Sequence, residues 1–324
     1  MLKLPLLTGE LIVSSPTFTG IIAFKGGVGK TVLSASLGIG LSYMLKRRVL
    51  LVDLDPQANL SEVFLTETTL SAVIKKAFET GRVFSFDLII RPSENPIIYE
   101  IPGIPGLYLL PSHHKFMREA AYGINVPMDR AVSFRGILGR LTKELELDHV
   151  IIDFPPQMYQ YVITIAAASA DYIVTPVAKG AFSIPSVGYL IETYYDVAKV
   201  IRREPSVFLG AILIRYDEGN SKLIKLSRER VKETVSKFFK NVNLSPPPVD
   251  PVFDTVLYYN PLLTKIRGQL IGSTPYIVKH ILGKYTSDVS RRLQDRLKAN
   301  IASLVREFEE RLNWLAALEK SRES

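Results

Sequence analysis

The sequence predicts an α/β fold: a doubly wound, mostly parallel sheet flanked by helices, with a long C-terminal helix. Short apolar runs alternate with helical stretches over about 200 residues. These runs are apolar on both faces, which is typical of strands buried in a parallel sheet. A glycine-rich turn also joins the first strand to the first helix, as in folds that bind phosphate groups.

The alternation assigns an element to most of the first 240 residues. Strands are expected at 19–24, 48–55, 106–112, 148–156, 170–177 and 206–217. Helices are expected at 30–46, 132–146, 184–203 and 220–240. Proline-rich stretches at 92–106 and 243–251 are expected to be surface loops.

The C-terminal stretch 287–320 is expected to form one long helix, because apolar residues recur in it at helical spacing. These residues are Val289, Leu293, Leu297, Ile301, Leu304, Phe308, Leu312 and Leu315. The helix is close to neutral, so an anionic membrane would gain little from binding it. Packing on the main domain or on a partner chain is therefore expected.

Composition limits the classes of function. The 324 residues include no cysteine, which excludes disulfides, zinc–thiolate sites and iron–sulfur clusters. No apolar run is long enough to cross a membrane, and the first 16 residues are expected to be an ordered or frayed extension rather than a signal peptide. The net charge of +8 suggests nucleic acid or an anionic membrane as a partner, or a surface that is basic for solubility.

The stretch FKGGVGKTVL, residues 24–33, resembles a phosphate-binding loop with an unusual start. The common signature G-x-x-x-x-G-K-[ST] would place glycine at position 24, where this chain has Phe24. Backbone N–H groups of the loop are expected to point into one concavity, with Lys30 reaching the β- and γ-phosphates and the Thr31 hydroxyl ligating Mg²⁺. The nucleotide-binding residues expected here are Lys25, Gly26, Gly27, Val28, Gly29, Lys30, Thr31 and Val32.

Acidic residues end two further strands. Asp53 and Asp55 lie in LLVDLDPQANLS (50–61), and Asp153 lies in HVIIDFPPQ (149–157). Because parallel strands bind ligands at their carboxyl ends, these carboxylates are expected beside the phosphate loop.

Together the K-G-G-x-G-K-[ST] loop, the D-x-D-P-Q motif and the apolar strand ending in Asp153 resemble the ParA/MinD family of deviant Walker A P-loop ATPases. The resemblance runs from residue 17 to about 280 and is to the short, Soj-like ParA type, which lacks an N-terminal helix-turn-helix domain. It implies an N-terminal extension (1–16), a P-loop ATPase domain (17–285) and the C-terminal helix (286–324).

The resemblance also implies roles for these residues. Lys25 would cross a dimer interface to the partner's ATP, Lys30 would hold the phosphates in its own chain, and Asp55 would orient or activate the attacking water. Thr31, Asp53 and Asp153 would surround Mg²⁺. Phe154, at the start of the second switch segment, departs from the small polar residue that is usual in the family.

Implied partners are a second copy of the chain bound with ATP, DNA contacted without sequence preference, and a ParB-like centromere-binding protein that stimulates hydrolysis. Such a protein is expected in the cytoplasm, associated with DNA, and a membrane is not expected as its partner. The basic residues expected to contact DNA are Lys222, Lys225, Arg228, Lys232, Arg267, Arg291 and Arg292. A solvated basic face is the alternative for each of them.

Two other functions remain open on the same scaffold. One is a MinD-like membrane-cycling ATPase, and the other is an ATP-dependent metabolic enzyme, such as a ligase of the dethiobiotin type. No nucleophile–base pair is evident elsewhere, and the histidines are expected to be structural: His113, His114, His149 and His280.

Overall fold

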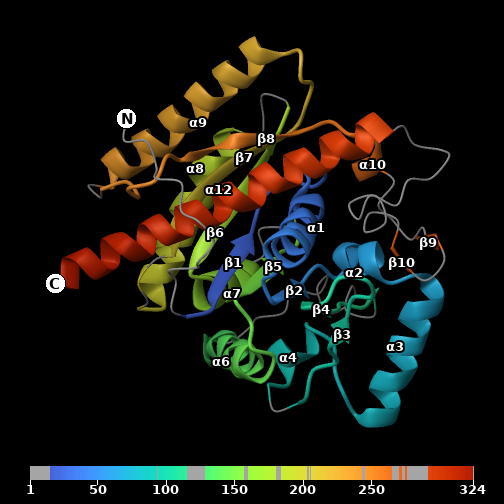
Figure 1. Ribbon diagram of the computed structural model, residues 1–324. Helices are drawn as coiled ribbons and strands as arrows, with labels where there is room; N and C mark the ends of the chain where they lie inside the picture. The colour runs from blue at the N-terminus through green and yellow to red at the C-terminus, as the bar shows by residue number, and fades with distance from the viewer. Residues whose placement is uncertain are drawn as a thin grey trace.

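The computed structural model has an eight-stranded sheet at its centre, in which neighbouring strands are parallel except for β3, which runs antiparallel to β4 (Figure 1). The strand order is β3-β4-β2-β5-β1-β6-β7-β8. The strands are β1 (Thr17–Ile21), β2 (Val49–Asp53), β3 (Tyr99–Glu100), β4 (Leu107–Leu110), β5 (His149–Asp153), β6 (Tyr172–Ala178), β7 (Val207–Tyr216) and β8 (Val252–Tyr258). A separate antiparallel pair consists of β9 (Leu270–Ile271) and β10 (Thr274–Pro275).

The structure describes residues 15–92, 94–114, 128–156, 160–179, 184–202, 204, 206–242, 245–264, 270–271, 274–275 and 291–323. Arg267, His280 and the expected domain boundary at 285/286 lie outside these residues, as does nearly all of the N-terminal extension.

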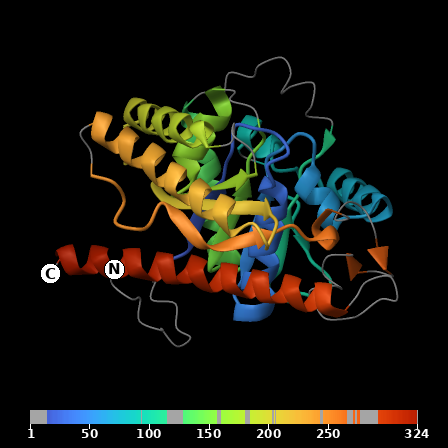
Figure 2. The ribbon, with the colours of Figure 1, turned by 90° about the horizontal axis from the view of Figure 1, so that it is seen from above.

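Helices cover both faces of the sheet. They are α1 (Lys30–Ile39), a π-helical continuation η1 (Gly40–Met44), α2 (Asn59–Phe64), α3 (Glu67–Thr80), α4 (Asp87–Ile90), α6 (Met128–Glu144), α7 (Gln160–Ser169), α8 (Pro185–Val200), α9 (Ser221–Asn241), α10 (Pro261–Thr264) and α12 (Arg291–Glu323). The helices α6, α7, α8 and α9 pack in a row, each on the next, and α1 packs against α12. Figure 2 shows α12 on the opposite side of the sheet from α8 and α9.

The predicted fold class is confirmed. Every predicted strand and helix is present, with ends that differ by a few residues. The sequence reading missed the short helices α2, α4 and α10, the helices α3 and α7, and the strands β3 and β8.

The helix predicted at 30–46 continues as a π-helix from Gly40, where α12 crosses it closely. A Cβ atom at Gly40 would lie 2.5 Å from Cγ1 of Val305 and 2.7 Å from Cγ2 of Ile301. Only glycine allows this approach. The apolar stripe of α12 is buried from Leu297 to Leu315, so the C-terminal helix packs on the main domain. Val289 lies outside the described residues.

Three features of the sequence meet at the carboxyl edge of the sheet. The glycine loop follows β1, and Asp53 and Asp153 end β2 and β5, which lie side by side with these two residues in register. Ile21, the last residue of β1, pairs with Asp153 on the other side. No helix in the described part of the chain is long and apolar enough to cross a membrane.

Candidate functional site

The glycine loop has the backbone shape that its sequence requires. Gly27 and Gly29 have φ angles of 74° and 99°, in the region that favours glycine. Gly29 is also the N-cap residue of α1, and a Cβ atom there would lie 2.7 Å from Cδ1 of Ile214 on β7. Glycine at position 29 is therefore required both by the turn and by the side chain beneath it.

A pocket of about 260 Å³ opens beside this loop. It is lined by Gly27, Gly29, Lys30, Thr31, Val32, Asp55, Asn59, Val63, Pro156, Arg215 and Leu263. Five of the eight predicted loop residues and one of the predicted acids are thus brought together around one cavity. Val28 is also buried in the loop.

The two loop lysines lie in different surroundings. Lys30 is buried and lines the pocket, and its burial lowers the pKa of its ammonium group, while Asp153 and Asp55 act in the opposite direction. Lys25 is exposed and is not among the residues that line this pocket. The loop therefore gives one lysine to its own cavity and presents the other at the surface.

Asp153 and Thr31, two of the residues predicted to surround Mg²⁺, form a polar pair. The Thr31 hydroxyl donates to Oδ2 of Asp153 over 2.9 Å, and the Ser34 hydroxyl donates to Oδ1 over 3.0 Å. The pKa of the Asp153 carboxyl is raised to about 7, chiefly by burial, which outweighs the lowering effect of the nearby Lys30 ammonium group. A buried carboxylate that accepts only hydroxyl groups has charge left to offer to a cation.

Asp53 accepts hydrogen bonds from the segment that follows β2. Its Oδ1 accepts the backbone N–H of Asp55 over 3.0 Å, and its Oδ2 accepts both the N–H (2.7 Å) and the hydroxyl (2.8 Å) of Ser61. Burial, together with Asp153 and Asp55, raises the pKa of this carboxyl well above its usual value. Asp53 is not among the residues that line the pocket, and its carboxylate oxygens hold the start of α2 in place.

Asp55 does line the pocket, at the start of the segment that leads into α2. Its Oδ1 accepts the N–H of Gln57 over 2.9 Å, and Nδ2 of Asn59 lies 3.3 Å from its Oδ2. These contacts hold a carboxylate at the mouth of the phosphate loop.

Two residues of the site carry information that the sequence did not reveal. Arg215, near the end of β7, lines the pocket and donates from Nη1 to the carbonyl oxygen of Gly27 over 2.9 Å. Phe154, the departure from the family pattern, is buried, and its ring would lie 3.1 Å from a Cβ atom at Gly20. Phe154 therefore fills core space beside β1, whereas Pro156 reaches the pocket.

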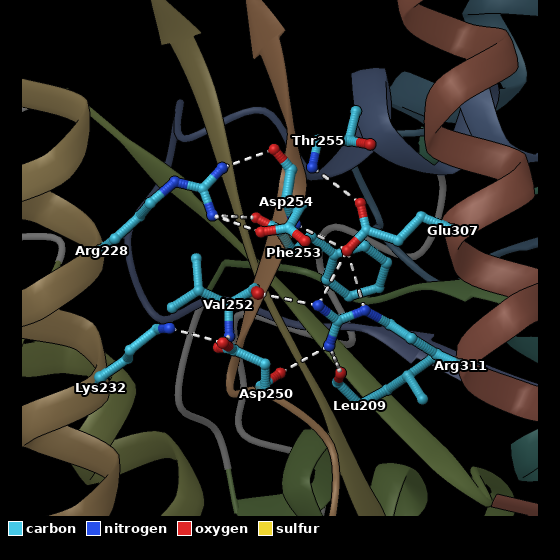
Figure 3. A network of polar contacts seen from close by, with 10 residues as sticks. All are labelled: Leu209, Arg228, Lys232, Asp250, Val252, Phe253, Asp254, Thr255, Glu307 and Arg311. Atoms are coloured by element: carbon cyan, nitrogen blue, oxygen red, sulfur yellow. Dashed lines mark hydrogen bonds and ion pairs between the residues drawn. The ribbon is translucent and has the colours of Figure 1, made fainter. Parts of the chain in front are cut away.

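The basic residues predicted on α9 divide into two pairs. Lys222 and Lys225 are exposed at the start of the helix. Figure 3 shows Arg228 and Lys232 turned instead toward β8: Arg228 donates to the carbonyl oxygens of Phe253 (2.7 Å) and Asp254 (2.5 Å), and Lys232 pairs with Asp250 (2.5 Å).

This second pair holds α9 on the sheet edge, so much of its charge is already matched within the chain. Arg291 and Arg292 are exposed at the start of α12.

Two of the described histidines contact neighbouring side chains of the fold. His149 is fully buried, with Nδ1 lying 2.7 Å from the Thr17 hydroxyl and its ring edge-on to Phe308. His114 lies 3.1 Å from a carboxylate oxygen of Glu62 at the surface. The described residues contain no group of three or more His, Cys, Asp or Glu side chains placed to hold a metal ion together.

Comparison with known proteins agrees with this arrangement. A family model described as an AAA domain matches residues 18–206, more than half of the chain. The chain is 29% identical to the sporulation initiation inhibitor protein Soj of Bacillus subtilis over 218 residues, covering 67% of this chain and 80% of Soj. It is 26% identical to the chromosome partitioning protein ParA of Caulobacter vibrioides over 242 residues, covering 73% of this chain and 78% of that protein.

Solved structures share the fold. The structure of pNOB8 ParA matches with a TM-score of 0.71 at 20% identity, and that of pNOB8 ParA bound to nonspecific DNA with 0.66 at 18%; each match covers 92% of this chain and 98% of the other. MinD from Aquifex aeolicus matches with 0.53 at 16%, covering 90% and 96%. At these identities the similarity to solved structures shows the fold alone. The family model that matches residues 18–206 shows that the chain belongs to the AAA domain family, and together with the similarity to Soj and the shared fold it identifies the chain as a ParA-type P-loop ATPase.

Proposed function

We propose that this protein is a DNA partition ATPase whose two loop lysines serve two different ATP molecules. The observation that carries the proposal is the placement of the lysines, with Lys30 buried in the pocket and Lys25 exposed outside it. Lys30 would bind the β- and γ-phosphates of ATP in its own chain. Lys25 would reach the ATP of a second copy, as an arginine finger does, so that ATP occupancy and dimer formation depend on each other.

Mg²⁺ fits the pair formed by Thr31 and Asp153. The Thr31 hydroxyl would bind the ion directly, and Asp153 would hold one of its water molecules. The ion would neutralise charge on the phosphates. Asp55, held by Gln57 and Asn59 at the pocket, would orient the attacking water. Asp53 would act through the backbone of Asp55 and through Ser61, as a positioning residue for this segment.

The ATP dimer would be the DNA-binding form. In the dimer the γ-phosphate contacts both subunits, and its loss on hydrolysis separates them. A ParB-like centromere-binding partner would stimulate this step. Support comes from the similarity to Soj and ParA proteins and from the fold shared with pNOB8 ParA, one structure of which is bound to nonspecific DNA. The function would place the protein in the cytoplasm, on DNA.

Among the basic residues of α9, the exposed pair Lys222 and Lys225 is the best candidate for phosphate contact, because Arg228 and Lys232 are engaged with β8. Lysine contacts with phosphates are independent of sequence, so binding should be similar for unrelated DNA. In this proposal residues 17–285 form the ATPase domain, and the C-terminal helix stabilises it.

The test is DNA binding by the purified protein with ATP, with ADP and without nucleotide. Binding should require ATP, and the log–log salt slope should flatten by about 0.9 for each DNA phosphate that a variant no longer neutralises. The double variant Lys222→Ala, Lys225→Ala should weaken DNA binding and leave basal ATP hydrolysis intact. The double variant Arg291→Ala, Arg292→Ala is its matched comparison, because it removes the same number of exposed positive charges from α12. Equal binding in all three nucleotide states would contradict the partition function.

The same preparation distinguishes the other two functions. A MinD-like membrane-cycling ATPase would sediment with anionic liposomes only when ATP is present. A metabolic enzyme would turn over rapidly with a small-molecule co-substrate. The fold is shared with one such enzyme, cobyrinic acid a,c-diamide synthase from Mycobacterium smegmatis, whose structure was solved with ADP and magnesium. That structure matches with a TM-score of 0.55 at 22% identity, covering 85% of this chain and 97% of the other.

A further inference from the structure

The carboxyl end of β7 has an irregular backbone. Arg215 has a φ angle of 61°, which is uncommon for a residue with a side chain, and the pairing of β7 with β8 shifts register between Ile214 and Tyr216. Such a conformation is unfavourable unless the surroundings compensate for it, and such positions cluster at ligand sites. The irregularity lies beside the phosphate loop.

Two consecutive residues of β7 contact that loop. Ile214 lies under Gly29, leaving no room for a Cβ atom there. Arg215 donates from Nη1 to the carbonyl oxygen of Gly27 over 2.9 Å and lines the pocket. In the part of the chain that the structure describes, no carboxylate is placed within ion-pair distance of Arg215. Its positive charge is therefore directed at the loop and the cavity.

The hydrogen bond acts on one particular peptide group. The Gly27 carbonyl and the Val28 N–H belong to the same peptide, and because the described chain has no cis peptide, these two groups point in opposite directions. Holding the carbonyl on Arg215 therefore turns the Val28 N–H to the other side. Without this contact the peptide could rotate easily, because Gly27 has no Cβ atom and tolerates many backbone angles.

A charged donor also polarises the peptide that it binds. A hydrogen bond from a guanidinium group to a carbonyl oxygen strengthens the N–H of the same peptide as a donor. The Val28 N–H is one of the loop groups expected to bind a phosphate. Arg215 can thus improve phosphate binding by orienting and polarising a backbone group, without touching the nucleotide.

We propose that Arg215 is a positioning residue that locks the Gly27–Val28 peptide in the orientation needed to bind phosphate. The proposal rests on the proposed function, since it assumes that this loop binds ATP. The irregular backbone of β7 serves to bring the guanidinium group to the Gly27 carbonyl.

The test compares Arg215→Ala, Arg215→Gly and Arg215→Lys with the wild type. Both Ala and Gly remove the guanidinium group, but glycine suits the backbone at this position, so an effect common to both comes from the side chain and not from strain. Arg202→Ala is the matched control, because Arg202 is also exposed with a positive φ (54°) and does not line the pocket.

The first measurement is amide hydrogen exchange at Val28 in the nucleotide-free protein. Among the described residues the Val28 N–H donates no backbone hydrogen bond outside helices and strands, so its exchange rate follows its acidity. The guanidinium group polarises this peptide and makes the N–H more acidic, so base-catalysed exchange should slow in the Ala and Gly variants, with partial recovery in Arg215→Lys. Arg202→Ala should match the wild type. Unchanged exchange at Val28 in Arg215→Ala would overturn the proposal whether or not the protein binds ATP.

The second measurement is affinity for MgATP and for inorganic pyrophosphate. Because the effect passes through the loop backbone, Arg215→Ala should weaken both by the same factor, about tenfold or more. A loss for ATP with no loss for pyrophosphate would mean that Arg215 contacts the nucleoside, and the proposal would be wrong. If the wild type bound neither ligand, the ATPase function would fail, while the exchange result would still decide the role of Arg215.

Discussion

Replacing Arg311 with methionine should destabilise the protein more than any other single change on α12. Figure 3 shows its guanidinium group reaching from α12 to the irregular pairing of β7 and β8. It donates to the carbonyl oxygens of Leu209 (3.0 Å), Asp250 (2.5 Å) and Val252 (2.8 Å), and it pairs with Glu307 over 2.8 Å. The group lies over the ring of Phe253, and the residue is almost completely buried.

The cost follows from what remains after the substitution. Glu307 would keep the backbone N–H groups of Asp254 (2.6 Å) and Thr255 (2.7 Å) but would lose the guanidinium group that pairs with its carboxylate. Breaking one partner of a buried pair costs about 3–5 kcal/mol, because the other charge stays buried. The three carbonyl oxygens lose their donor as well, so we expect the upper part of that range.

Urea unfolding measures the loss directly. The transition midpoint of Arg311→Met should fall with little change in the slope of free energy against urea. Arg306→Met is the matched control, because Arg306 is an exposed residue on the same helix, and it should change stability by less than about 0.5 kcal/mol. A loss below about 1 kcal/mol for Arg311→Met, or an equal loss for both variants, would show that this buried network does not stabilise the fold as described.

Three further predictions concern the loop, the metal and pH. Lys30→Ala should weaken ATP binding by about 10- to 100-fold in calorimetry, because it removes a charged contact from the phosphates. Asp153→Ala should weaken Mg²⁺-dependent ATP binding, and an unchanged magnesium titration would remove Asp153 from the metal site. Glu309 is buried, and its carboxylate lies 2.6 Å from Arg47 and 3.5 Å from His149. Burial alone would raise the pKa of this carboxyl, but the two partners outweigh burial and lower the pKa below its usual 4.5. The pKa of Glu309 is lower in the folded than in the unfolded protein, so its carboxylate contributes stability above pH 4.5, and this contribution is lost as the pH falls through the folded pKa. Glu309→Gln should therefore make the free energy of unfolding fall less steeply with acid.

The sheet and the loop could be predicted because their signals are local. Buried parallel strands are continuous apolar runs, and the spacing of Gly29, Lys30 and Thr31 has a direct meaning for phosphate binding. The carboxyl edge of a parallel sheet then brings Asp55 and Asp153 to the same place, and both lie beside the loop in the structure.

Other features depend on contacts between distant parts of the chain. The orientation of Asp53 is set by Ser61, eight residues later, and cannot be read from a strand that ends in an acid. Arg215 looks like an ordinary strand residue until the register shift turns it toward Gly27. On α9 the sequence pattern shows a basic face, but only the placement of β8 reveals that Arg228 and Lys232 are held by the fold.

The proposed action of Lys25 on the ATP of the partner subunit is best tested by mixing two inactive variants. Lys25→Ala and Asp55→Ala should each lack ATP turnover alone. In a mixed dimer, the site in the Lys25→Ala subunit keeps its own Asp55 and receives Lys25 from the other subunit, so one of the two sites is complete. With random pairing in a two-fold dimer, an equal mixture should recover about a quarter of the wild-type rate per chain. If the mixture shows only the sum of the two separate rates, Lys25 does not act in trans and its proposed role is wrong.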